Sequence, residues 1–209
     1  MPNTSGNSYA LTTFCPIRNG HHGEIPNYAL TRKKLQELPD NEGSPMARVD
    51  NTYLARFYIL DDAIFNSYPS DLDKLQSKYL VFTSNFHGDL DTYLTGMWNS
   101  ISADIQQIWA DCVGFDTVNS AQSFIEYIKK CQLYTTFFFN GSTDESLQEQ
   151  LKSLFLKQEF SKFVFAHQGV PAKQLLSDFK EFIAWSKPKV LSAPTWKAGA
   201  CSLDGICKN

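Results

Sequence analysis

The sequence lacks a long apolar run and a strong excess of either charge. No hydrophobic stretch approaches the ~18 residues of a membrane-spanning helix, so we expect no membrane span. The 19 basic and 22 acidic residues are interspersed and give a formal net charge of -3, which does not indicate a nucleic-acid partner. The first residues, MPNTSGNSYALTTF, lack the charged and apolar regions of a signal peptide, and we therefore expect a cytoplasmic protein.

Cysteine is scarce, with five residues in the whole chain. Cys15, Cys112 and Cys131 lie within apolar patterns, which is typical of reduced thiols in a cytosolic core. Cys201 and Cys207 are close enough in sequence for a small disulfide loop in the C-terminal tail. A docking peptide, a modification site or a loose terminus with incidental thiols are the alternatives for this pair. With no second pair nearby, we expect no metal site there.

Hydrophobic and aromatic residues are abundant, at 43% and 14% of the chain, so an ordered core is expected. Four short runs rich in β-branched and aromatic residues predict strands. They are Leu11–Ile17, Tyr53–Leu60, Tyr79–Phe86 and Tyr134–Asn140. Pro16 restricts the first run to a strand end or a sheet edge.

Helical spacing of apolar residues predicts helices between the strands and after the last one. They fall near residues 28–38, 90–98, 101–112, 120–131, 144–165 and 171–185. Asp89 and Ser120 are expected to cap two of them. The resulting order predicts an α+β fold, a ferredoxin-like sandwich with a four-stranded antiparallel sheet and extra C-terminal helices. We expect a flexible arm over residues 1–9, the main domain over 10–185 and an extended tail over 186–209.

The predicted strands carry apolar side chains on both faces, so both faces of the sheet should be covered. Helices can cover one face, and a second copy of the same sheet is the economical cover for the other. The sequence therefore predicts a homodimer that pairs through its sheet faces in the manner of a dimeric α/β-barrel.

Five segments together resemble a bacterial family that has no assigned activity. They are LTTFCPI, ARVDNTYLARFYILDD, YLVFTSNFHGDLDTYL, IQQIWADCVGF and YTTFFF, and the resemblance extends over residues 10–182. The resemblance implies a dimeric α/β-barrel, similar in fold to dye-decolourising peroxidases and chlorite dismutases. It also implies haem as a cofactor and a peroxidase-like activity. The peroxidases carry a G-x-x-D-G motif. The related stretch Asn85–Asp89 lacks both outer glycines of this motif, so the resemblance does not assign the role of distal aspartate to a residue of this chain.

Haem iron needs a protein ligand, most often histidine. His87 follows a predicted strand and precedes a helix, and His167 follows a long helix, so either is a candidate ligand. The alternatives are a turn residue for His87 and a helix-end residue for His167. Tyr53 is a candidate for the cofactor pocket, with a place in the aromatic core as its alternative. The adjacent His21 and His22 are expected in a solvated loop.

Arg56 interrupts an apolar strand, and a buried arginine needs a partner. It is a candidate catalytic residue that would clamp a propionate or an anionic substrate. An ion pair with Asp61, with Asp62 or with a dimer partner is the alternative. Asp89 is a second candidate, as one of an acid–base pair with Asp91, and a helix cap is its alternative.

Three functions remain open from the sequence. The first is a haem-binding or peroxidase-like oxidoreductase. The second is a non-catalytic binding or assembly module that uses the aromatic sheet face and the cysteine-containing tail. The third is a cofactor-free monooxygenase that acts on a small molecule held between sheet and helices.

Overall fold

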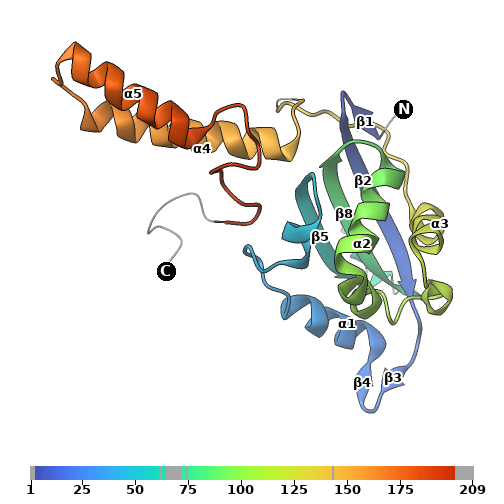
Figure 1. Ribbon diagram of the computed structural model, residues 1–209. Coiled ribbons are helices and arrows are strands. Elements are labelled where there is room, and N and C mark those ends of the chain that lie inside the picture. Colours follow the sequence, from blue (N-terminus) through green and yellow to red (C-terminus); the bar gives the residue numbers. More distant parts are fainter. Residues whose placement is uncertain (1–2, 62, 65–71, 74, 143, 201–209) are drawn as a thin grey trace. The chain divides into compact units, whose positions relative to one another are not determined.

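The computed structural model of this protein describes residues 3–61, 63–64, 72–73, 75–142 and 144–200 (Figure 1). The chain divides into two compact units, Met1–Asp144 and Glu145–Asn209. The first unit holds the sheet and three helices, and the second holds two helices. The predicted domain of residues 10–185 is therefore divided after Asp144. Its C-terminal helices form a unit of their own.

One four-stranded antiparallel sheet organises the first unit, which confirms the predicted α+β class. Its strands lie in the order β1-β2-β8-β5, so β8 is central. Their bounds are Thr4–Ser5 for β1, Ser8–Ile17 for β2, Thr52–Leu60 for β5 and Lys78–His87 for β8. Two short ribbons pair β3 (His21–His22) with β4 (Ile25–Pro26) and β6 (Ala63–Ile64) with β7 (Leu72–Asp73).

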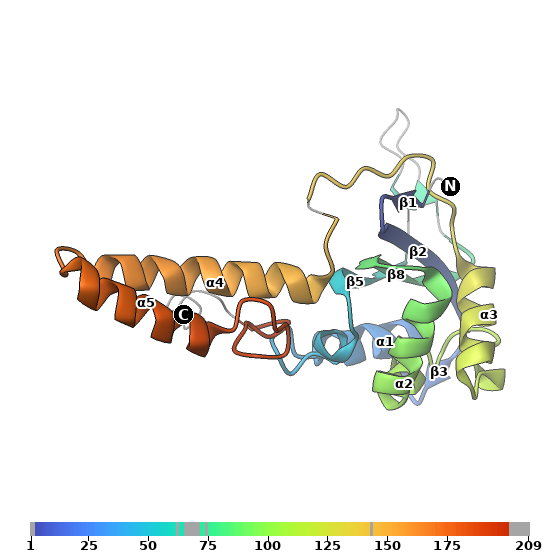
Figure 2. The ribbon, with the colours of Figure 1, turned by 45° about the horizontal axis from the view of Figure 1, so that its top comes forward.

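Three helices cover one face of this sheet (Figure 2). They are α1 (Asn27–Gln36), α2 (Leu90–Ile108) and α3 (Ala121–Cys131), with short 3-10 turns η1 at Pro45–Arg48 and η2 at Phe115–Thr117. Because side chains alternate along a strand, every second residue of β2 and β8 enters the core beneath the helices. The buried core includes Leu11, Cys15, Ile17, Leu80, Phe82, Phe86, Leu94, Met97, Ile105, Trp109, Phe124 and Ile128.

The junction between β8 and α2 is formed as the sequence predicts. β8 ends at His87, and Gly88 turns the chain with a φ of 101°, a region that glycine enters without steric cost. The Asp89 carboxylate then accepts a hydrogen bond from the Thr92 amide at 2.9 Å, so Asp89 is the N-cap of α2. The two predicted helical segments that follow form one helix, α2, with non-helical backbone angles at Ile101.

The predicted strand at Tyr134–Asn140 is wrong, because the structure has no strand there. The N-terminal residues occupy the edge of β2 instead, through β1 and through a bond from the Ala10 amide to the Asn3 carbonyl. The 134–140 segment hydrogen-bonds mainly to side chains of that N-terminal stretch, such as Asn3 and Ser8. Residues 3–9, expected in a flexible arm, thus supply the fourth strand and the start of β2.

The second sheet face carries both exposed and buried side chains among the described residues. Leu54, Arg56 and Tyr58 of β5 are exposed on this outer face, whereas Val81 of β8 is buried. The alternation along β5 and β8 also puts Tyr79 there, next to Phe14 at a ring distance of 6.0 Å. The sequence predicts a second sheet over this face, and that dimer stays a prediction.

The second unit is a hairpin of two helices, α4 (Leu147–Ala166) and α5 (Ala172–Ser186). Ser146 and Glu149 form a capping box that starts α4. Residues 187–200 follow α5, and Lys152 Nζ connects this stretch to the hairpin through a bond to the Pro194 carbonyl at 2.8 Å. The predicted cysteine loop of the tail, Cys201 with Cys207, lies outside the described residues. No described helix is long and apolar enough to cross a membrane.

Candidate functional site

His87 and Tyr53 are brought together at one end of the sheet. The Tyr53 hydroxyl and His87 Nδ1 share a hydrogen bond of 3.0 Å, and both side chains are half-buried. The rings meet edge to face with their centroids 6.4 Å apart. The bond fixes the orientation of the imidazole through Nδ1. His87 is therefore a positioned histidine at the strand end.

Asp89 follows His87 by two positions in the sequence, but its carboxylate caps the N-terminus of α2. The Thr92 backbone amide, which donates to it, holds the pKa of Asp89 below its usual range. A charged carboxylate with a lowered pKa is suited to stabilise the positive end of the helix dipole. It is poorly suited to take up a proton near neutral pH.

Arg56 is exposed in the single chain, in contrast to the buried arginine that the apolar strand pattern suggested. Its Nε donates to the Thr83 hydroxyl at 3.3 Å across the β5–β8 ladder. Asp61, one of its predicted partners, pairs instead with Arg32 at 2.5 Å, and this pairing lowers the pKa of Asp61. The other predicted partner, Asp62, lies outside the described residues.

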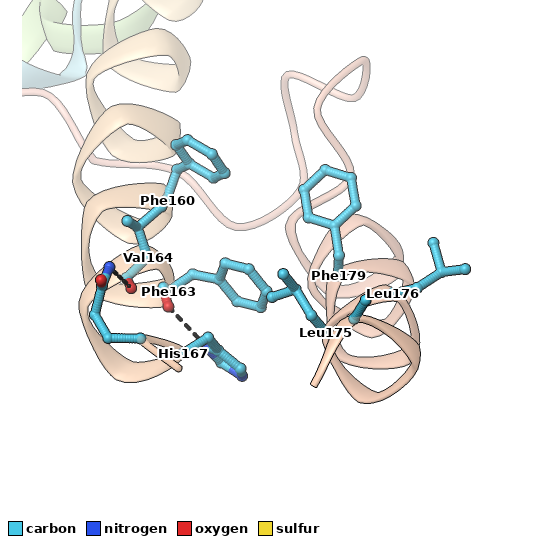
Figure 3. A pocket seen from close by; sticks show the side chains of 9 residues that line it. Phe160, Phe163, Val164, His167, Leu175, Leu176 and Phe179 are labelled. Carbon is cyan, nitrogen blue, oxygen red and sulfur yellow. Dashed lines mark hydrogen bonds between the residues drawn. The ribbon is translucent and has the colours of Figure 1, made fainter. Parts of the chain in front are cut away.

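His167 belongs to the second unit and ends α4 (Figure 3). Its Nδ1 donates to the Phe163 carbonyl at 2.7 Å, and its Nε2 lies 3.4 Å from an Asp178 carboxylate oxygen. Its ring also stacks on Phe163 with the centroids 4.0 Å apart. Both ring nitrogens are thus engaged by the hairpin, which matches the helix-end alternative for this residue.

An open apolar pocket of about 440 Å³, which the sequence analysis did not predict, lies between the two helices of the hairpin. Figure 3 shows Phe160 and Phe163 of α4 opposite Leu175 and Phe179 of α5 around it. The apolar spacing of both helices was visible in the sequence. That spacing did not reveal that the two helices pair only with each other within their unit.

A buried carboxylate, Asp111, anchors the loop that follows α2. It accepts hydrogen bonds from Lys34 at 3.0 Å and from Thr31 at 3.4 Å, and it contacts His22 at 3.2 Å. Burial acts to raise the pKa of Asp111, but the bonds from Lys34 and His22 outweigh it and hold the pKa below its usual value. His22 is therefore part of a structural ion cluster.

Three thiols gather where α3 meets β2. Cys15 and Cys112 are fully buried, whereas Cys131 is half-buried and lines a cavity of about 450 Å³. Interaction with the Cys15 thiol lowers the pKa of Cys131 to about 7, and the Tyr127 hydroxyl and the Lys130 charge act in the same direction. Burial raises the pKa of Cys112 to about 12. The sequence predicted three reduced core thiols, and no motif marks Cys131 as different.

Among the described residues, no group of three or more His, Cys, Asp or Glu side chains is arranged to hold a metal ion. Comparison with protein-family models, curated proteins and solved structures returned no match to this chain. The resemblance to a dimeric α/β-barrel family therefore stays a prediction.

Proposed function

We propose that this protein is a non-catalytic assembly module that self-associates through its α4–α5 hairpin. One observation carries the proposal, namely the number of large apolar side chains that the hairpin leaves exposed. We call these residues the hairpin surface. They are Leu154, Phe160, Val164, Phe165, Leu176, Phe179, Ile183 and Trp185.

A two-helix unit has too little interior to bury this many apolar residues. Apolar side chains occur around most of the circumference of α4, a pattern typical of a helix that is covered on several sides. Among the 20 residues of α4 only Lys152 is fully buried, and its charged end is bound to backbone carbonyls. Exposed apolar patches of this kind mark interaction surfaces.

A second copy of the hairpin is the partner that fits these helices. Two antiparallel hairpins form a four-helix bundle, in which each pair supplies the layer that the other lacks. α4 spans 20 residues, about 30 Å, which is a usual length for such bundles. The two helices carry five lysines and four acidic residues, so like charges do not oppose pairing of two copies.

Size measurement with matched variants tests this proposal. We expect light scattering to give twice the mass of one chain for the wild type, and a monomer for the double variant Phe165→Gln/Leu176→Gln. The control is Phe137→Gln/Phe139→Gln, which alters two exposed phenylalanines of the first unit and should leave the dimer intact. A monomeric wild type, or a hairpin variant that dimerises as well as the control, would overturn the proposal.

The outer sheet face is a second surface for self-association, as the ferredoxin-like, dimeric-barrel fold would require. The exposed Leu54 and Tyr58 support it, because an apolar sheet face needs a second layer. The double variant Leu54→Gln/Tyr58→Gln distinguishes the two surfaces. If this variant is monomeric while the hairpin variant stays dimeric, the sheet pairs and the hairpin proposal is rejected.

Haem binding at His87 is the second candidate function. The hydrogen bond to Tyr53 supports it, because a metal-bound histidine usually has a partner that orients the ring through its other nitrogen. His87 and Arg56 also share the outer face by strand alternation, so Arg56 would meet an anionic group of a ligand there. A bound haem would supply redox chemistry, and these residues would hold and orient it.

Absorbance spectroscopy tests this candidate. Purified protein supplied with haem should develop a Soret band that is lost in His87→Ala and kept in His167→Ala. An unchanged spectrum of free haem in the wild type would reject the candidate. A band that depends on His167 would reject His87 as the ligand.

A further inference from the structure

We propose that residues 3–5 are a displaceable latch on the edge of the sheet, and that residues 134–138 pair with β2 in their place when the latch is released. We call residues 3–5 the latch. Both segments lie in the first unit, so the proposal is independent of how the hairpin assembles. It adds a second arrangement of the sheet edge to the one that this structure shows.

The residues directly after α3 are already paired with β2. Gln132 forms an antiparallel bridge with Thr13, and the Leu133 amide donates to the Thr12 carbonyl at 2.8 Å. Figure 1 shows the segment that follows them running past β1. The register of an antiparallel pair stays constant along its ladder, so these two rows also define the rows that would come next.

Asn3 occupies the next hydrogen-bonded row of this ladder. In the continued register Thr135 faces Ala10, and such a pair exchanges two backbone hydrogen bonds. In this structure the Asn3 carbonyl accepts from the Ala10 amide at 2.8 Å, and Asn3 Nδ2 donates to the Ala10 carbonyl at 2.8 Å. Asn3 Oδ1 accepts from the Thr135 amide at 3.2 Å. Asn3 therefore binds the Ala10 amide, the Ala10 carbonyl and the Thr135 amide, which would bond to one another's strand if Asn3 were absent.

A tight turn keeps the latch in place. β1 has only two residues, and Gly6 and Asn7 connect it to β2. Asp144 holds this turn, because its carboxylate accepts from the Asn7 amide at 2.7 Å and from Asn7 Nδ2 at 2.9 Å. Gly6 has a φ of 60°, and a Cβ atom there would lie 2.7 Å from the Asp144 carboxylate. A side chain at Gly6 would therefore disrupt the turn and release the latch.

The segment that would replace the latch has the composition of a strand. Residues 134–138 are aromatic or β-branched, and such residues fit a sheet edge well. Tyr134 and Phe137 are 79% and 80% exposed in this structure. Pairing with β2 would remove part of this apolar surface from water, which favours the exchange once the latch is released.

The exchange would change the outer sheet face beside His87. Ser8 pairs with His87 of β8, and the continued register places Phe137 on the other side of Ser8. Side chains of facing residues lie on the same side of a sheet, so Phe137, Ser8 and His87 would form one row on the outer face. Release of the latch would thus bring an aromatic ring to the end of the sheet that holds His87.

Nuclear magnetic resonance of the full-length double variant Asn3→Ala/Gly6→Val tests the proposal. Asn3→Ala removes the side-chain bonds of the latch, and Gly6→Val disrupts its turn. The control is Gly23→Val in the turn between β3 and β4. Gly23 has a φ of 62°, and a Cβ atom there would meet nothing within 4 Å, so the control adds similar backbone strain away from the latch.

The register predicts two changes in the double variant. Contacts between α protons should appear for Tyr134 with Leu11 and for Thr136 with Tyr9, because Cα atoms of such non-hydrogen-bonded pairs are about 4.5 Å apart. The Phe137 amide, which would donate to β2, should exchange with solvent at least tenfold more slowly than in the wild type. Neither change is expected in Gly23→Val.

Proline substitutions in the double variant show whether the pairing has the proposed hydrogen bonds. Thr135→Pro removes an amide that would donate to β2, and it should abolish the contact between Tyr134 and Leu11. Thr136→Pro changes an amide that would point away from β2, a position where an edge strand tolerates proline, and it should keep this contact.

Three results would overturn the proposal. The first is a folded double variant without the two α-proton contacts. The second is the same contacts in Gly23→Val, since release of the latch would then not be their cause. The third is a contact between Tyr134 and Leu11 that persists with Thr135→Pro. Should the double variant fail to fold, Asn3→Ala alone decides, because it removes both side-chain bonds of Asn3 and should give the same contacts at lower intensity. Their absence there would also overturn the proposal.

Discussion

Lys152 Nζ lies 2.6 Å from the carbonyl oxygen of Ser186, so a buried ammonium group from the start of α4 caps the end of α5. The same nitrogen donates to the Pro194 carbonyl, and it lies 5.5 Å from the centre of the Phe155 ring. Burial lowers the pKa of Lys152, and these contacts offset part of the cost of keeping the charge away from water.

We expect Lys152→Met to reduce the stability of the hairpin by about 2 kcal/mol, because two carbonyls lose a charged donor. Hydrogen exchange of the α4 and α5 peptides measures this loss directly. Lys157→Met, at an exposed position of the same helix, is the control. Equal protection in both variants would show that the buried ammonium contributes nothing to the hairpin.

The Asp111 cluster should make the first unit sensitive to acid. Because its folded-state pKa is lowered, Asp111 contributes stability above the unfolded value of about 4, and this contribution is lost as the pH falls through the folded value. We expect Asp111→Asn to lower the free energy of unfolding by about 1–3 kcal/mol at pH 7 and by progressively less below pH ~4. Urea titrations at several pH values measure the difference.

Asp116→Asn is the control for this experiment, since Asp116 lies 3.9 Å from Arg18 with a largely exposed side chain. Its effect should stay within about 0.5 kcal/mol at every pH. A destabilisation by Asp111→Asn that is independent of pH would contradict the explanation by charge.

Ser146 should contribute measurably to the start of α4. Its hydroxyl accepts from the Glu149 amide at 3.3 Å, and the Glu149 carboxylate accepts from the Ser146 amide at 3.1 Å. Removing such a cap by Ser146→Ala costs about 1 kcal/mol, which should appear as faster exchange in the first turns of α4. Ser153→Ala, inside the helix at an exposed position, should not increase exchange.

Alkylation of Cys131 should follow its lowered pKa. The groups that face it are Cys15 on β2, Lys130 and Tyr127 on α3, and Cys112 after α2. The rate with iodoacetamide should rise with pH and reach half its maximum near pH 7, because only the thiolate reacts. Cys15→Ala removes the largest cause of the shift, so the midpoint should move up towards about 8.5. An unmoved midpoint would disprove the role of Cys15.

The parts of the fold that local sequence determines were predictable. β5, β8 and the Asp89 cap follow from strand composition and cap chemistry within a few residues, and each is present in the structure. The Tyr134–Asn140 segment has equally good strand composition. It fails because β1 and Asn3 already occupy the neighbouring edge of β2, and a local pattern contains no information about that competition.

Side-chain environments were harder to predict for the same reason. Arg56 was expected to be buried because its neighbours are apolar, but β5 leaves its outer side chains exposed. The bridge between Thr13 and Gln132, which brings the end of α3 beside β2, joins residues more than a hundred positions apart, and nothing near either residue signals it. His87, by contrast, lies at the predicted strand end, where the sequence could not foresee its bond to Tyr53.

The central position of β8 has a consequence for how the protein folds. Every residue of β2 pairs with β8, from Ser8 with His87 to Ile17 with Lys78, so the ladder joins positions about 60 to 80 apart. Pairing over such separations requires closure of a long loop. The entropy cost of this closure arises before the strand contacts stabilise the chain, and this slows folding. On the ribosome the N-terminal strand must wait, unpaired, until β8 has emerged. A chaperone that shields strand edges should therefore speed recovery of the first unit while leaving the locally connected hairpin unaffected.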